Sequence, residues 1–265
     1  MKYFNDKVIW ITGASSGIGE AIAISLIKNS NAQLVLSARN KDKLQEIANT
    51  SNNPQRILVL PFDLSQNFDA HSLTQQVIHQ FGKIDILINN GGISQRSKVL
   101  ETSEEIERTL FEINYFSYVK LSRAVLPYMI QQRYGHIIVM SSIAGKFGFY
   151  LRSTYSAAKH ALHGYFESLR LEYENEGIRV SIVCPGKVKT NVSINAITGT
   201  GNKHGQMDES HQNAMSAEQA AKIILKNIVL QKEEIYVGGK ELIMVYLKRF
   251  CTPLFNWLIR KQSAY

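Results

Sequence analysis

The chain has 265 residues, 45% of them hydrophobic and 20% charged, with a formal net charge of +8 and a pI near 9.3. This length and apolar content suit one large domain, and no repeat, low-complexity tract or linker divides the chain. The positive charge raises nucleic acid as a partner, but the basic residues are scattered and no nucleic-acid-binding motif is present, so nucleic-acid binding is not expected.

The first expected element is a short apolar strand over residues 8–12. It runs into Gly13-Ala-Ser-Ser-Gly-Ile-Gly19 and then into a helical pattern over residues 20–27. Strand, glycine-rich turn and helix N-terminus together indicate an anion site, because bare N–H groups and the positive helix end face a phosphate. The spacing G-x-x-x-G-x-G differs from the common G-x-G-x-x-G fingerprint. A purely structural turn is the alternative, but the flanking strand and helix favour a nucleotide cofactor.

Further apolar runs alternate with helical stretches along the chain. The expected strands are residues 33–37, 57–61, 84–89, 135–140, 179–184 and 234–237. This alternation predicts a single-domain α/β Rossmann fold: a doubly wound, seven-stranded parallel sheet with helices on both faces. Ligands of such folds bind at the carboxyl ends of the strands.

Tyr155 and Lys159 stand four residues apart in a stretch that reads as a helix. Their Cβ atoms should lie on one face, roughly 5–6 Å apart. A fixed positive charge favours the phenolate and brings the tyrosine pKa down from about 10 toward working pH, where proton transfer is effective. Such a pair also arises by chance on solvated helix faces, so its meaning depends on the rest of the chain.

The sequence resembles the short-chain dehydrogenase/reductase family over about residues 5–240. The motifs that carry the resemblance occur in the family's order: Thr12-Gly-Ala-Ser-Ser-Gly-Ile-Gly19, Asp63-Leu64, Asn89-Asn-Gly-Gly92, Asn114, Ser141-Ser142, Tyr155-x-x-x-Lys159 and Pro185-Gly186. The resemblance implies four catalytic residues, namely Asn114, Ser142, Tyr155 and Lys159.

The expected cofactor is NADP(H). After the second strand the chain has Arg39 and no acidic residue, which suits a ribose 2′-phosphate better than a 2′-hydroxyl; a surface role for Arg39 is the alternative. The resemblance implies that Asp63 binds the adenine amino group, Leu64 packs beside the base and Asn89 lies near the ribose. The expected cofactor contacts are Gly13, Ser15, Ser16, Gly17, Ile18, Gly19, Arg39, Asp63, Leu64, Asn89, Asn90, Gly91, Tyr155, Lys159, Pro185, Gly186, Val188 and Thr190.

The family resemblance also implies a role for each catalytic residue. Tyr155 donates a proton to a carbonyl, or takes one from an alcohol, and Lys159 lowers its pKa and holds the nicotinamide ribose. Ser142 hydrogen-bonds the oxygen on which charge develops. Asn114 interrupts a helical segment over residues 103–130 and holds a water that relays protons. No metal site is expected, since the histidines show no ligand spacing.

Substrate choice is expected to lie in residues 191–215, a long polar loop of the kind that often forms a lid. The sequence of this loop is similar to that of the dehydrogenase/reductase member-seven branch, and this resemblance implies a lipophilic carbonyl or alcohol substrate. Four side chains were expected to wall the pocket, although core packing explains them nearly as well: Phe147, Phe149, Tyr150 and Leu151. The alternatives are a 3-oxoacyl-acyl-carrier-protein reductase and a non-catalytic NADP-binding regulator.

We expect a catalytic domain over residues 1–240 and a separate tail over residues 241–265. The tail is apolar, but Lys248, Arg249 and Pro253 argue against a spanning helix. It could lie in a membrane interface, or pack on a neighbouring subunit or over the pocket. Free cysteines and the lack of an apolar leader predict a reducing, cytoplasmic setting. The resemblance implies a homo-oligomer, a dimer or a tetramer.

Overall fold

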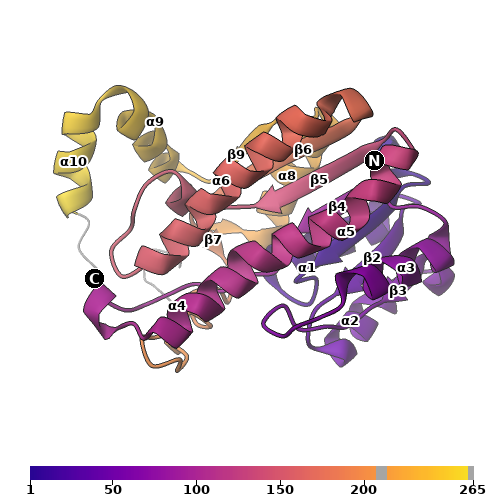
Figure 1. Ribbon diagram of the computed structural model, residues 1–265, viewed down its shortest axis with the longest axis horizontal. Coiled ribbons are helices and arrows are strands. Elements are labelled where there is room, and N and C mark those ends of the chain that lie inside the picture. Colours follow the sequence, from indigo (N-terminus) through magenta and orange to yellow (C-terminus); the bar gives the residue numbers. More distant parts are fainter. Residues whose placement is uncertain (207–213, 262–265) are drawn as a thin grey trace.

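The computed structural model describes residues 1–206 and 214–261. Seven parallel strands form one sheet in the order β3-β2-β1-β4-β5-β6-β9 (Figure 1). The strand order reverses between β1 and β4, which creates the crevice where ligands of such sheets bind. The predicted seven-stranded parallel sheet is therefore confirmed. Its strands are β1 Val8–Thr12, β2 Gln33–Ser37, β3 Ile57–Val59, β4 Ile86–Asn89, β5 Gly135–Met140, β6 Ile178–Pro185 and β9 Glu234–Val237.

Helices cover both faces of the sheet (Figure 1). One face carries α1 Gly17–Asn29, α2 Lys41–Ala48 and α8 Ala217–Val229. The other carries α3 Ala70–Phe81, α5 Ser117–Gln131 and α6 Ser153–Tyr173. Before α5 come α4 Glu104–Phe111 and a π-helical turn, Glu112–Phe116.

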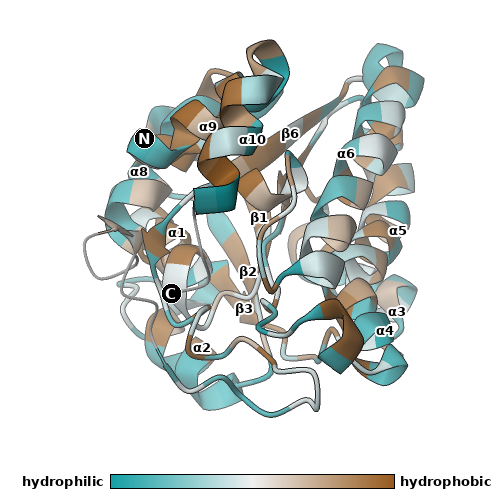
Figure 2. Cartoon of the chain, turned by 90° about the vertical axis from the view of Figure 1, so that its left-hand side faces the viewer, coloured by the Kyte–Doolittle hydropathy of each residue, from teal (hydrophilic) through white to brown (hydrophobic). Residues whose placement is uncertain are grey.

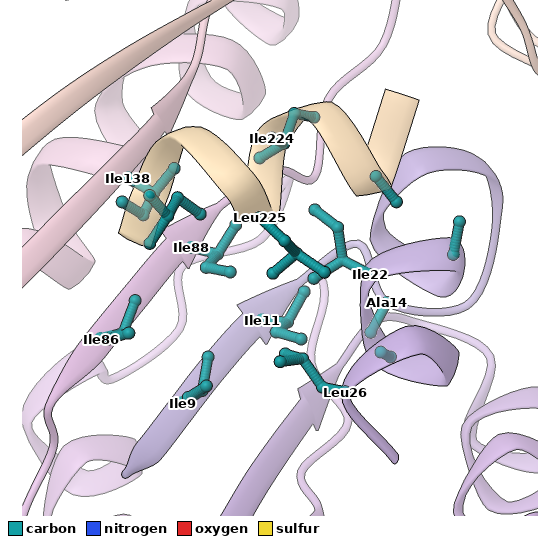
Figure 3. Packing of buried hydrophobic residues seen from close by; sticks show 14 of the residues in the cluster. Ile9, Ile11, Ala14, Ile22, Leu26, Ile86, Ile88, Ile138, Ile224 and Leu225 are labelled. Atoms are coloured by element: carbon teal, nitrogen blue, oxygen red, sulfur yellow. The ribbon is translucent and has the colours of Figure 1, made fainter. Parts of the chain in front are cut away.

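The core explains why the strands are apolar on both faces. Successive side chains of a strand point to opposite sides of the sheet, so a sheet covered twice needs apolar residues throughout. Figure 3 shows Ile9 and Ile11 of β1 packed beneath α1 and α8, whereas Trp10 between them belongs to the other layer. Each fully buried side chain of this size contributes roughly 1.5–3 kcal/mol. This rigid double layer fixes the strand ends that carry the site.

Outside the main sheet the chain forms three smaller pieces. A two-stranded parallel sheet joins β7 Val188–Lys189 to β8 Met215–Ser216. The helices α9 Ile243–Phe250 and α10 Thr252–Lys261 form a hairpin at one end of the molecule (Figure 1). Within the described ranges, every helix is too short or too polar to cross a bilayer.

Candidate active site

Two adjoining cavities lie at the carboxyl ends of β1, β4, β5 and β6. The larger has a volume of about 210 Å³ and contains all four expected catalytic side chains in its lining. The second, of about 200 Å³, is lined by Ser15, Arg39, Asp63 and Leu64. Both cavities share Gly13, Ser16 and Gly91 in their walls. The two cavities form one groove, and all but two of the sequence-predicted site residues line it.

The glycine-rich turn leaves room for an anion at the start of α1. Gly13 has φ +63°, a conformation that disfavours side chains, and a Cβ there would lie 2.6 Å from Gly91 Cα. Ser16 is the N-cap of α1 but its side chain makes no capping hydrogen bond. The first N–H groups of a helix have no intrahelical partner, so this end offers donors and positive potential to a phosphate. The turn fits the pyrophosphate of a dinucleotide.

The turn is pinned to β4 by a compact set of hydrogen bonds. Thr12 Oγ1 accepts from the backbone N–H groups of Asn90 and Gly91 at 2.9 and 3.1 Å. In return the Asn90 side-chain amide donates to the carbonyls of Thr12 and Gly13 at 3.0 and 3.3 Å. Asn90 therefore acts on the cradle by holding its backbone in shape.

Ser142 and Tyr155 reach the larger cavity from two different segments. Ser142 follows β5, where its Oγ donates to the Pro185 carbonyl at 3.4 Å and accepts from Ala144 N–H at 3.1 Å. Tyr155 lies in the first turn of α6, half-buried, and is hydrogen-bonded to Ser142. The two hydroxyls are thus placed to meet one substrate oxygen.

Lys159 and Asn114 form the floor of the same cavity. Lys159 is 3% exposed and its ammonium donates to the Met140 carbonyl at 2.7 Å. Asn114 sits in the π-helical turn, where its amide donates to the carbonyls of Ile93 and Leu110 at 3.0 Å each. A Cβ on Gly92 would lie 2.7 Å from Asn114 Oδ1 and 3.7 Å from Lys159 Nζ, so the backbone between them must stay bare.

The electrostatics differ from the sequence expectation. Burial raises the pKa of Tyr155 above its ordinary value, against the lowering influence of Arg152, the Ser142 hydrogen bond and Arg96. Burial also lowers the pKa of Lys159 to about 7. Lys159 is not among the groups that shift the pKa of Tyr155 here, so its expected lowering of that pKa stays a prediction.

Sequence reasoning missed Gln95, which positions the catalytic helix. Gln95 is fully buried in the loop after β4, and its Oε1 accepts from the backbone N–H groups of Thr154 and Tyr155. No local signal in the sequence marks it, since the residues it caps lie about 60 positions further along the chain. It is found only from the tertiary structure.

The expected lid is described over residues 191–206 and 214–215, and its first part lies against the loop that holds Gln95. Backbone hydrogen bonds join Arg96 N–H to the Ile197 carbonyl at 2.8 Å and Ile197 N–H to the Ser94 carbonyl at 2.9 Å. Asn191, Val192 and Asn195 line the larger cavity. Residues 207–213 of the expected lid lie outside the described residues.

Two expected cofactor contacts lie away from both cavities. Asn89 is fully buried, and its amide donates to Ser122 Oγ at 3.0 Å, which ties β4 to α5. Gly19 packs against the turn instead, where a Cβ would approach the Gly13 carbonyl to 2.3 Å. Both residues shape the groove from behind.

The predicted aromatic wall is wrong. In the described chain none of its members, Phe147, Phe149, Tyr150 and Leu151, lines either cavity. Phe147 is buried, with its ring 4.8 Å from that of Phe149 and 5.0 Å from that of Phe255. Tyr150 is 57% exposed. Phe147 and Phe149 pack with the C-terminal hairpin instead.

A polar cluster lies behind the catalytic loop. Lys146 Nζ contacts Glu234 and donates to His163 Nδ1 at 3.2 Å. His163 Nε2 lies 3.1 Å from Ser141 Oγ, which donates to the Lys159 carbonyl. The imidazole accepts at Nδ1, so it carries its proton on Nε2, and burial lowers its pKa to about 4.

The same cluster brings His163 and Glu234 close to Cys184. Each residue has one atom of a type that can bind a metal ion, and these three atoms lie within 4.8 Å of one another. Burial raises the pKa of the Cys184 thiol to about 12, so it stays protonated near neutral pH. The Lys146 ammonium supplies the positive charge that faces Glu234.

The parallel α/β sheet, the bare glycine turn at its switch point and the neighbouring serine, tyrosine and lysine define a dinucleotide-dependent type of active site. The family model described as short chain dehydrogenase matches residues 7–200. The chain is 36% identical to a Drosophila melanogaster protein named dehydrogenase/reductase SDR family protein 7-like, over 97% of this chain and 81% of the relative. It is 38% identical to human dehydrogenase/reductase SDR family member 7, over 97% of this chain and 78% of the relative.

Solved structures show the same fold. A short chain dehydrogenase/reductase from Burkholderia phymatum has a TM-score of 0.82 and 23% identity, covering 96% of each chain. A short-chain dehydrogenase from Streptomyces avermitilis has a TM-score of 0.80 and 26% identity, covering 98% of each chain. The protein belongs to the short-chain dehydrogenase/reductase family and is an oxidoreductase of that family.

Proposed function

We propose that the protein is an NADP(H)-dependent oxidoreductase that interconverts a ketone or aldehyde and an alcohol, with Tyr155 as the acid/base. One observation carries this proposal: Ser142, Tyr155, Lys159 and Asn114 line one cavity that opens onto the glycine-rich turn. These residues come from three segments of the chain, so their meeting is not the chance neighbourhood of a helix face.

Each side chain has a defined task in this reaction. When bound, the nicotinamide supplies or accepts the hydride. Tyr155 donates a proton to the carbonyl oxygen, and its raised pKa keeps it in the protonated form that can donate. The Ser142 hydroxyl hydrogen-bonds the same oxygen as negative charge develops. Lys159, anchored on the Met140 carbonyl, adds positive potential beside the phenol to the extent that it is charged.

Tyr155→Phe tests the chemical step. The rate of NADPH-driven carbonyl reduction should fall by about 10²–10⁴-fold, the range for general acid catalysis. Binding of NADPH, followed by its fluorescence, should stay close to wild type. Tyr150→Phe is the matched control, since Tyr150 is exposed and outside both cavities. A wild-type protein that binds NADPH but turns over no carbonyl substrate would favour the non-catalytic regulator.

Arg39 supports NADP(H) over NAD(H). It lines the second cavity with Ser37 and Asp63, and a guanidinium there suits the 2′-phosphate. Similar folds do not choose between the cofactors, because the Burkholderia phymatum structure is in complex with NAD and a serine dehydrogenase structure is complexed with NADP+. Arg39→Ala should raise KM for NADPH by about 10–100-fold and leave that for NADH almost unchanged. Lys41→Ala, two residues away on the surface, is the control.

We propose a lipophilic substrate. The larger cavity has apolar side chains in its lining beside the expected cofactor contacts, including Ile93, Met140 and Val192. The curated relatives belong to the member-seven branch, whose resemblance implies such substrates. A panel of long-chain and cyclic ketones should be reduced faster than small keto acids or a carrier-linked 3-oxoacyl thioester. Turnover of the thioester alone would instead identify the carrier-protein reductase.

We also propose a homo-oligomer assembled through the helices around Asn114 and Tyr155. Phe116 in the π-helical turn is 50% exposed and Leu171 on α6 is 73% exposed, which leaves apolar area on these helices for a partner subunit. Light scattering should give a mass of at least twice 29.9 kDa, and Leu171→Glu should lower it. A monomeric wild type would contradict this assembly.

A further inference from the structure

The hairpin of α9 and α10 carries both buried and exposed apolar side chains. Met244, Val245 and Phe255 are at most 8% exposed and pack against Ile143 and Phe147. The outward side chains, which we call the tail face, are 43–77% exposed and are Ile243, Tyr246, Phe250, Leu254 and Trp257. Figure 2 looks at this end of the molecule, and its colouring marks hydrophobic residues in brown on both helices.

The tail face concentrates many of the exposed apolar side chains of the protein in one short segment. The described chain has fourteen strongly exposed large apolar side chains, and five of them fall within these fifteen residues. Isolated exposed apolar residues are normal on a protein surface, whereas a contiguous group marks an interaction site. Since the inward side chains already anchor the hairpin, the tail face is left for an external partner.

The charged side chains of residues 242–261 are all basic. Lys248, Arg249, Arg260 and Lys261 lie on the two helices, and no acidic residue occurs between residues 242 and 261. Some of the cations lie over aromatic rings: Lys261 Nζ is 3.5 Å from the centroid of Trp257. This mixture of aromatic and basic side chains is typical of helices that lie in a membrane interface.

We propose that the tail face docks on the surface of a bilayer containing anionic phospholipid. Phosphate headgroups would meet the four cations, and the aromatic and aliphatic side chains would enter the acyl boundary. A second copy of the chain is a poorer occupant, because a two-fold contact would bring four cations against four with no acidic residue of this segment between them.

Docking would bring the active site close to the lipid. Glu241, in the turn that leads into the hairpin, accepts a hydrogen bond from Lys187 N–H at 2.8 Å, beside Gly186 in the cavity wall. The inward anchor packs on Ile143, the residue after Ser142. Insofar as the lipophilic substrate of the proposed function holds, the membrane would deliver that substrate to the pocket; the docking itself does not depend on the reaction.

The chain contains its own reporter for this test. It has two tryptophans: Trp10 is fully buried, and Trp257 is 55% exposed in the tail face. On adding phosphatidylcholine vesicles that contain phosphatidylglycerol, the full chain should co-sediment and its emission should shift to the blue as Trp257 leaves water. Vesicles of phosphatidylcholine alone should bind much less. Changing Lys248 and Arg249 to Gln should weaken binding by about fivefold for each charge removed.

Phe250→Glu should abolish sedimentation and the blue shift, whereas Leu100→Glu, at a fully exposed apolar residue far from the hairpin in sequence, should alter neither. Lipid-free NADPH oxidation with a water-soluble ketone should be the same for Phe250→Glu and wild type, which separates failure of docking from failure of the proposed reaction. The proposal is overturned if anionic vesicles cause no shift, or if Phe250→Glu halves the mass of the protein in the absence of lipid, since a second copy would then cover the tail face.

Discussion

Gln95 caps the helix that carries Tyr155. Its Oε1 accepts hydrogen bonds from the backbone N–H groups of Thr154 and Tyr155 at 3.0 and 3.1 Å. Its amide nitrogen lies 3.1 Å from Ser97 Oγ and from Thr102 Oγ1, within its own loop. The first turn of a helix needs such acceptors, so Gln95 fixes the position from which Tyr155 enters the cavity.

Gln95→Leu should therefore damage both stability and catalysis. Two buried N–H groups would lose their acceptor, and each group left unpaired should cost about 1–3 kcal/mol of stability. We expect kcat to fall more than KM rises, because the displaced group acts in the chemical step. Gln95→Glu keeps an acceptor at the helix N-terminus and should restore much of the activity. Urea unfolding and steady-state kinetics measure both effects, with Gln76→Leu on the surface of α3 as control; equal kcat in Gln95→Leu and the control would contradict the positioning role.

Alanine substitution should have opposite effects on stability at two glycines, one in the glycine-rich turn and one in α6. At Gly13 a Cβ would meet Gly91 at φ +63°, so Gly13→Ala should destabilise by about 1–2 kcal/mol and weaken NADPH binding by about tenfold or more. Gly164 lies mid-helix in α6 with open space around its Cβ position, so Gly164→Ala should stabilise by about 0.5–1 kcal/mol. Thermal unfolding and NADPH titration check both; unchanged affinity in Gly13→Ala would count against the anion cradle.

Buried His136 should lower the stability of the folded protein as the pH falls. It is 1% exposed, with Nε2 2.8 Å from Ser181 Oγ, and burial lowers its pKa to about 3. Between about pH 6.5 and that value the unfolded chain binds a proton that the native state refuses, so stability falls as pH falls, by at most about 1.4 kcal/mol per pH unit. The difference in unfolding free energy between wild type and His136→Leu should shrink over this range. Exposed His79→Leu is the reference, and a constant difference would refute the buried neutral imidazole.

Lys146 should stabilise the folded protein through its ion pair with Glu234. Their ion pair and the hydrogen bond that Tyr236 donates at 2.7 Å hold the pKa of Glu234 below its usual value, against the effect of burial. Lys146→Met removes the ammonium, so the variant should be less stable at neutral pH. The gap should close as pH falls below about 4.5 toward the lower pKa that Glu234 has in the folded protein. Lys226→Met, at an exposed position of α8, gives the baseline. A gap that widens in acid would rule out this ion pair as the cause.

Much of the fold was accessible from the sequence because local pattern and tertiary role agree. The runs at residues 8–12, 33–37, 135–140 and 234–237 are strands with the predicted bounds. Other strand ends shift by one or two residues, as at β3, which stops at Val59. The predicted interruption of the long helix is confirmed, since Asn114 lies in a π-helical turn between α4 and α5.

The errors came from contacts that no local pattern encodes. Phe147 was expected in the pocket, but Phe255, more than a hundred residues later, takes up its ring. Spacing placed Lys159 beside Tyr155, but the burial of the lysine and its hydrogen bond to the Met140 carbonyl come from the fold. Spacing along a helix gives a shared face, but not the solvation of the groups on it.

The π-helical turn at Glu112–Phe116 has a consequence for how this segment can change. A π turn is wound more loosely than its neighbours and holds one residue more than an α turn would need. Deleting a single residue there would leave a regular helix. Asn114 would then rotate away from the cavity floor, and the hydrogen bond that its amide donates to the Ile93 carbonyl would be lost. This stretch should therefore tolerate substitution on its outer side far better than any change in its length.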